Sequence, residues 1–356
     1  MATQKRPRSS NFELMRIVLM LLIVGHHLLS NTSLHDLISL QNPTPNSRLL
    51  LLFSMWGKTA INPFVMVTGY FMCTSRLTIS RVAKLYAQIK FYRLGIFALL
   101  AALGYQAVNR TELFNAAFNI ARFAGNGFVA SFMVFYLFIP WYNQLIKALD
   151  ERQHRYLVAM LLFWHTGTPL LFGNTTLFNE VTWYITLYLV ASYIRLYPSP
   201  YTESAPLSTG ALLVSMALSM ASVLFFAARG SSTDQAWYYA YRLVSDSNQI
   251  LALVTGIAIF LFFKNHKVPQ SKFINTIAST TFGILLIHAS SPAMNEFLWE
   301  RLLGVSGLIA LSPAALLVRM IAYTMLVFAV CSAIDLLRIN FIEEPFMSWF
   351  DSRWGK

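Results

Sequence analysis

The sequence predicts an all-α, polytopic membrane protein with about ten transmembrane helices and both termini in the cytoplasm. Two features of the composition indicate this class. Hydrophobic residues make up 56% of the 356 residues, and charged residues only 12%, whereas soluble chains carry about twice that charged fraction. The third observation is the recurrence of apolar stretches of about 20 residues, the length that a helix needs to cross a bilayer. What remains between these stretches is too short to form a soluble domain.

The apolar stretches follow one another along the whole chain. The first follows a basic start but has no small-residue cleavage site after it, so we interpret it as a retained helix and not as a signal peptide. The second contains Asn62 and Pro63, and the third contains Lys90 and Arg93, so these two are candidates for a break or for a position against a cavity. The predicted spans are 12–30, 49–73, 84–106, 128–146, 156–173, 181–197, 207–227, 247–263, 273–291 and 310–334.

The distribution of basic residues predicts the orientation. With the N-terminus inside, the cytoplasmic loops collect most of the 27 Lys and Arg residues, as the positive-inside rule requires. The chain then divides into a cytoplasmic N-terminal segment (1–11), a transmembrane domain (12–334) and a cytoplasmic tail (335–356). The net charge of +12 follows from this bias and from attraction to anionic lipids, so it does not indicate binding of nucleic acid.

The first apolar stretch contains the most informative pair of residues, Arg16 and His27. Eleven positions separate them, which in a helix is close to three full turns and roughly 16 Å along the axis. Both side chains should therefore lie on one face, a cation near the cytoplasmic rim and an imidazole near the middle of the membrane. Ionisable residues inside a membrane are costly and are functional candidates by default. The structural alternative is an Arg that reaches the interface and a His held by neighbouring helices.

Several stretches resemble one known family in the same order. The first is the pattern of Arg16, ten residues and His27. The others are NPFVMVTGYF (62–71), FYLFIPWYN (135–143), WYITLYLVASYIRLYP (183–198), FINTIASTTFGILLIH (273–288) and the pair Asp335 and Arg338 near the end. On these motifs, which extend from about 12 to 340, the chain resembles the integral-membrane acyltransferase 3 family, and most of all its Gram-positive branch associated with cell-surface polysaccharide.

The resemblance implies an acyltransferase of the cell membrane that uses acyl-CoA, most often acetyl-CoA, as its donor and a cell-surface or lipid-linked glycan as its acceptor. Such a transfer needs a base for the acceptor hydroxyl, a stabilised oxyanion and a dry site. We assign the base to His27 and expect a structural role for its neighbour His26. His288 is a third candidate, which could orient His27, bind the acceptor or be satisfied locally.

Cations are expected to hold the anionic phosphates of the donor. Arg16 is one candidate, and Lys90 and Arg93 are the others because they lie inside an apolar stretch. The sequence contains no Walker A, GxGxxG or HExxH pattern and no paired Cys/His spacing, so we expect neither ATP, NAD nor a metal.

The chain departs from the family pattern at three places. Gly127-Phe128 stands where relatives have Trp-Phe, and Leu285 and Ala289 replace the usual Tyr and Asp of the late segment. If the usual Tyr or Asp contacts the acceptor, these changes predict an acceptor that differs from that of relatives. Two other functions share the predicted span count: a transporter or flippase of lipid-linked or glycan intermediates, and a glycan polymerase or ligase. The modest length of the external stretches counts against the polymerase.

Overall fold

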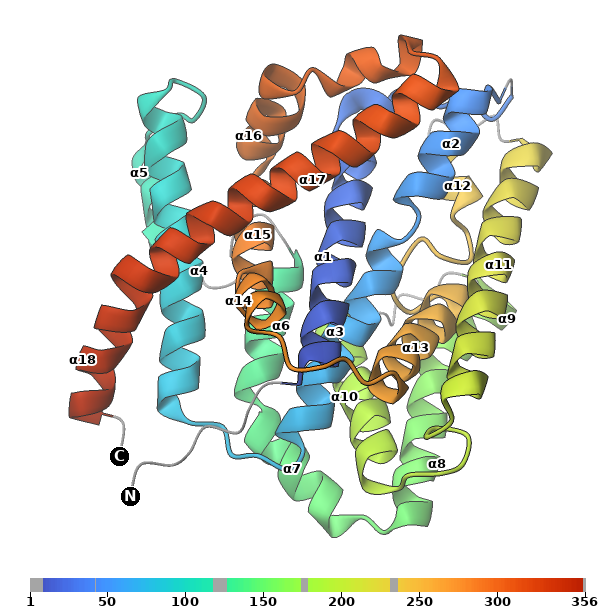
Figure 1. Ribbon diagram of the computed structural model, residues 1–356, viewed down its shortest axis with the longest axis vertical. Helices are drawn as coiled ribbons and strands as arrows, with labels where there is room; N and C mark the ends of the chain where they lie inside the picture. Colours follow the sequence, from blue (N-terminus) through green and yellow to red (C-terminus); the bar gives the residue numbers. More distant parts are fainter. Residues whose placement is uncertain (1–8, 42, 118–126, 174–178, 231–235, 355–356) are drawn as a thin grey trace.

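The structure is a computed structural model that describes residues 9–41, 43–117, 127–173, 179–230 and 236–354 (Figure 1). This described part consists of helices and connecting segments and contains no β-strand. The prediction of an all-α protein is therefore confirmed. Residues 1–8 of the predicted N-terminal segment lie outside the described residues.

The first half of the chain forms two long helices and a series of shorter ones. Their bounds are α1 (Ser10–Ser30), η1 (Ser33–Leu37), α2 (Pro45–Ser54), α3 (Gly57–Met72), α4 (Ile79–Ala102), α5 (Arg110–Ala117), α6 (Gly127–Leu137), α7 (Ile139–Ala148), α8 (Glu151–Leu162), η3 (Phe163–Gly167) and α9 (Thr168–Phe172).

The second half also alternates long and short helices. Their bounds are α10 (Glu180–Leu196), α11 (Ala205–Arg229), α12 (Ala236–Ala240), α13 (Ile250–Asn265), α14 (Lys272–Ser279), α15 (Thr281–His288), α16 (Pro292–Asn295), η4 (Glu296–Leu302), η5 (Val305–Ala310), α17 (Pro313–Arg338), η6 (Ile339–Glu343) and α18 (Glu344–Trp354). Helical structure thus continues from α17 into the predicted tail as far as Trp354.

Local sequence signals explain where several helices begin. The side chain of Thr78 accepts a hydrogen bond from the backbone of Arg81 at the start of α4, and Asn179 accepts one from Val181 at the start of α10. Such caps satisfy backbone N–H groups that have no partner within the helix. The cap at Asn179 fixes the first turn of α10 and, with it, the position of the residue that follows, Glu180.

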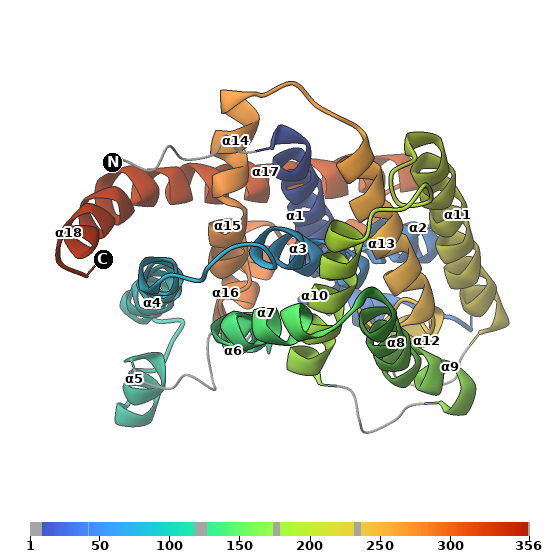
Figure 2. The ribbon, with the colours of Figure 1, turned by 90° about the horizontal axis from the view of Figure 1, so that it is seen from below.

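Helix α1 lies at the centre of the bundle (Figures 1 and 2). It packs against α2, α3, α13, α14, α15 and α17, so neighbours surround it on nearly all sides. Its apolar residues, among them Met15, Leu19 and Val24, are fully buried. The residues that the sequence analysis selects on this helix therefore face protein and not lipid.

Two glycines allow helices to approach α3 closely. A Cβ atom at Gly69 would lie 2.9 Å from the backbone of Tyr188 on α10, and one at Gly256 would lie 2.7 Å from the Cβ of Asn62. Small residues permit this backbone contact in membrane bundles. The Asn62 amide also donates to the carbonyls of Ser247 and Ala252, so the polar residue in the second predicted span joins α3 to the start of α13.

In the described part of the chain, five helices or continuous helical segments are long and apolar enough to cross a membrane. The number rises to seven if two bent pairs, Gly127–Ala148 and Lys272–Leu302, are each counted as one span. Helices α10 and α13 overlap the predicted spans 181–197 and 247–263. At 17 and 16 residues, however, they are shorter than the helices counted here as membrane-crossing. The region 156–173 divides among α8, η3 and α9.

The outer helices expose apolar faces. On α11, Leu213, Val214 and Phe225 are more than half exposed, and on α17 the most exposed is Val318. Contiguous apolar surface of this extent is expected to face lipid. With the long apolar helices, it identifies the chain as a membrane protein.

Candidate functional site

His27 and His288 meet inside the bundle although 261 positions separate them in the sequence. The Nδ1 atom of His27 lies 2.9 Å from Nε2 of His288. His27 stands near the end of α1 and is partly buried, whereas His288 ends α15 and has no exposed surface. The structure thus brings together two of the three predicted catalytic residues.

The hydrogen bonds of this pair determine which nitrogen of each ring carries the proton. Nδ1 of His288 lies 2.6 Å from the backbone carbonyl of Ile284. A carbonyl oxygen only accepts, so Nδ1–H of His288 is the donor. With both rings neutral, Nε2 of His288 then accepts from Nδ1–H of His27. The remaining nitrogen, Nε2 of His27, is left with a free lone pair, as a general base requires.

A bend in the chain places His288 at this position. The helical segment Lys272–His288 and the segment Pro292–Leu302 meet at 99°. All of α15 is buried, and Gly283 lets it approach α17, because a Cβ atom there would collide with the Asp335 carboxylate. The ring of Trp299 stands edge-on to that of His288, with 6.5 Å between their centroids. The packing of α15 and the contact with Trp299 therefore fix the position of the His288 ring.

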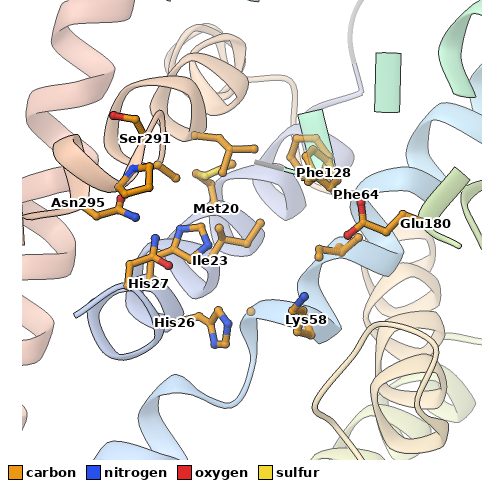
Figure 3. A pocket seen from close by; sticks show the side chains of 17 residues that line it. Met20, Ile23, His26, His27, Lys58, Phe64, Phe128, Glu180, Ser291 and Asn295 are labelled. Carbon is orange, nitrogen blue, oxygen red and sulfur yellow. The ribbon is translucent and has the colours of Figure 1, made fainter. Parts of the chain in front are cut away.

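A cavity of about 260 Å³ lies beside His27 (Figure 3). Its polar wall contains amides, a hydroxyl, an ammonium group and a carboxylate, and its apolar wall contains aliphatic and aromatic side chains. The polar residues are His26, His27, Asn31, Lys58, Glu180, Ser291 and Asn295; the larger apolar residues are Met20, Ile23, Ile61, Phe64, Phe128 and Leu285.

His26 also touches this cavity, but its ring is held by backbone. Its Nδ1 atom donates to the carbonyl of Ser54 at 2.6 Å, and the ring packs so closely on Gly57 that a Cβ atom there would collide with it. These contacts fix the junction between α2 and α3. They agree with the structural role that we expect for His26.

Arg16 lies in the first half of α1 and is connected to the same interior through Phe64. Its guanidinium pairs with Glu13 at 3.1 Å and lies 5.7 Å from the centroid of the Phe64 ring. Phe64 is in turn part of the wall of the His27 cavity. Arg16 and His27 thus face the same side of the unbroken helix α1, with Arg16 beyond the cavity wall.

Lys90 and Arg93 stand on α4 and do not line the His27 cavity. Lys90 belongs to a second cavity of about 540 Å³ between α4 and the region of η6 and α18, which Lys84 and Arg338 also line. Helix α15 packs against both α1 and α4 and lies between these two helices (Figure 2). Lys90 and Arg93, the cations of α4 proposed for the donor, therefore lie on the other side of α15 from His27.

The residues that differ from the family pattern gather at the His27 cavity. Gly127, Leu285 and Ala289 all line it. At these positions the wall has small or apolar side chains, whereas the resemblance implies a larger aromatic or a charged side chain. The differences thus affect the part of the protein that a substrate beside His27 would contact.

Sequence reasoning did not select Lys58, Glu180, Asn31 or Asn295. Glu180 and Lys58 interrupt or border apolar stretches, a signal that could have found them, because charges at such positions need a reason. The two asparagines carry no comparable signal. Among the described residues, no group of three or more His, Cys, Asp or Glu side chains is placed to hold a metal ion.

The comparisons with known proteins identify the family of the chain. Residues 9–336 match a family described as an acyltransferase domain. No curated protein and no solved structure matches the chain. The family match covers nearly the whole chain, including Arg16, His27 and His288, and the exposed apolar helices show that the protein is membrane-bound. The chain belongs to the acyltransferase 3 family and is a membrane acyltransferase.

Proposed function

We propose that this protein transfers an acyl group, most simply acetyl, from cytoplasmic acyl-CoA to a hydroxyl of a cell-surface or lipid-linked glycan. The proposal places it in the cell membrane with both termini cytoplasmic. The observation that supports it best is the free lone pair of His27 Nε2 beside a cavity that combines amides with aromatic rings. Aromatic faces and amide groups suit the apolar faces and the hydroxyls of a sugar.

In the proposed reaction, Nε2 of His27 takes the proton of the acceptor hydroxyl as its oxygen attacks the thioester carbonyl. The C–O ester bond forms, the C–S bond breaks, and the proton on His27 passes to the leaving thiolate. The amide groups of Asn31 and Asn295 supply N–H donors in the cavity for the negative charge that develops on the carbonyl oxygen. The surrounding apolar wall keeps water from competing for the acyl group.

The donor is proposed to bind through cations. Its phosphates are anionic, and Lys90 lines a largely apolar cavity together with Lys84 and Arg338, which both pair with the Glu343 carboxylate. Arg16 lies beside the wall of the His27 cavity, where it can hold an anionic group on the donor's path.

The proposal predicts that purified protein in nanodiscs consumes a thioester. Given acetyl-CoA and a glycan acceptor, it should release free CoA thiol and form an ester that mass spectrometry detects as one added acetyl group. Slow release without a glycan would also support the proposal, because water can accept the acyl group. A transporter breaks no covalent bond. If acetyl-CoA neither binds nor is cleaved, while vesicles with the protein move a labelled lipid-linked sugar between leaflets, the transporter is the better assignment.

A second prediction concerns donor binding. Replacing Arg16 or Arg93 with alanine should weaken binding of acyl-CoA by roughly ten- to a hundredfold, because a charge-assisted hydrogen bond contributes about 1.5–3 kcal/mol. Titration of acyl-CoA against purified variants measures this. Arg301→Ala is the matched control, since Arg301 is an exposed arginine that pairs with exposed Glu296 and is not among the cations proposed to hold the donor. Unchanged donor affinity with a lost rate in Arg16→Ala would instead place Arg16 in the catalytic centre.

A further inference from the structure

Glu180 brings a carboxylate into the His27 cavity. It is the first residue of α10, and the cap at Asn179 fixes that helix start. Figure 3 shows its carboxylate directed toward the cavity, on the side opposite Asn295 and Ser291. Gly127 lies next to it: a Cβ atom there would be 3.3 Å from Oε2 of Glu180. The missing side chain at Gly127 leaves the carboxylate accessible from the cavity.

Among the residues that the structure describes, the charges around the cavity do not cancel. The ammonium of Lys58, on the cavity wall, pairs with the Asp246 carboxylate at 3.1 Å, so these two charges compensate each other. Glu180 forms no ion pair with any of the described residues. With neutral histidines, the described part of the wall therefore carries one negative charge without a described counter-charge, held by a carboxylate that can only accept hydrogen bonds.

We propose that Glu180 recognises the acceptor and selects for a sugar without negative charge. The inference rests on the proposed function and specifies its acceptor. A sugar placed with one hydroxyl at His27 meets Glu180 on the other side of the same cavity. There a neighbouring hydroxyl or an ammonium group donates to the carboxylate, whereas a ring that bears a carboxylate or phosphate is repelled. Glu180 thus sets the preference amino sugar, then neutral sugar, then acidic sugar.

The test uses three probes that differ in one group: the methyl glycosides of glucosamine, glucose and glucuronic acid. Protein in nanodiscs receives acetyl-CoA and each probe, ester formation is followed by mass spectrometry, and binding of each probe is measured by calorimetry. For the wild type, the KM and Kd of the glucuronic acid glycoside should exceed those of the glucosamine glycoside by tenfold or more. Glu180→Gln should remove most of this difference, and Glu180→Lys should reverse the order.

A matched control separates recognition from helix stabilisation. An acidic residue at a helix start also interacts favourably with the helix dipole, so a purely structural Glu180 would lower the Tm of Glu180→Gln without changing the order of the probes. Glu203→Gln, at an exposed carboxylate that pairs with Lys264, should keep the wild-type order.

Two results would overturn the inference. One is an unchanged order of probes in Glu180→Gln; the other is a wild type that cleaves acetyl-CoA but neither binds nor acylates the glucosamine and glucose glycosides. Both leave the proposed donor chemistry intact. Failure of the proposed function is a different result, because acetyl-CoA would then be neither bound nor cleaved.

Discussion

Replacing His27 with alanine is expected to reduce acyl transfer to near background while the protein stays folded and inserted. His26 and His27 both keep an Nε2 lone pair, but among the described histidines of the cavity wall only His27 has its Nδ1–H held by a second imidazole. Loss of a general base lowers a rate by about 10²–10⁴-fold. Ester formation from acetyl-CoA and a glycan, measured in nanodiscs, gives the ratio of rates.

Two variants act as controls for this result. His27→Gln retains an N–H that can donate to Nε2 of His288 but has no basic nitrogen, so it should keep the wild-type Tm and still lose the rate. His26→Ala should retain a measurable rate, because the His26 ring is held by the Ser54 carbonyl. The base is assigned to the wrong histidine if His26→Ala is inactive while His27→Ala and His27→Gln transfer acyl groups normally.

Replacing His288 with leucine should lower kcat on the order of 10²-fold, with a much smaller effect on the KM of either substrate. Without Nε2 of His288, the Nδ1–H of His27 loses its acceptor. The ring is then free to change its tautomer and its orientation, and a misplaced catalytic group costs a factor of this order. Steady-state kinetics with both substrates varied separate kcat from KM.

The conservative variant His288→Gln distinguishes positioning from simple packing. Its side-chain oxygen can accept from His27, so it should recover a large part of the rate that His288→Leu loses. If leucine and glutamine variants lose the same rate and the same Tm, His288 only fills space between α15 and Trp299. A loss that appears only in the KM of the glycan would instead make His288 part of acceptor binding.

The sequence alone was sufficient for the features that depend on local order. Long apolar stretches predict helices because a bilayer offers no partner to backbone N–H and C=O groups, and the described part of the chain indeed forms helices and no strand. The spacing of Arg16 and His27 predicts one shared face because helix geometry is fixed over eleven residues, and α1 is unbroken across both. The order of the motifs predicted the family that residues 9–336 match.

Hydropathy was less informative about where one helix ends and the next begins. It counts apolar residues without regard to bends, so the stretches 128–146 and 273–291 read as single spans. In the structure, chain directions change by 54° and 99° within or next to these stretches. The second bend ends α15 at His288, and this end is what brings the imidazole to His27.

Only the tertiary structure decided the composition of the site. The contacts of His27 with His288 and of Glu180 with Gly127 join residues that are far apart in the sequence. Conversely, Lys90 lies in a cavity separate from that of His27, although the sequence had suggested one common site. These relations depend on which helices cross and how closely, and the closeness is set by small residues such as Gly69 and Gly283 at the crossings. Hydrophobic periodicity identifies the buried face of a helix, but it does not specify the partner that covers it.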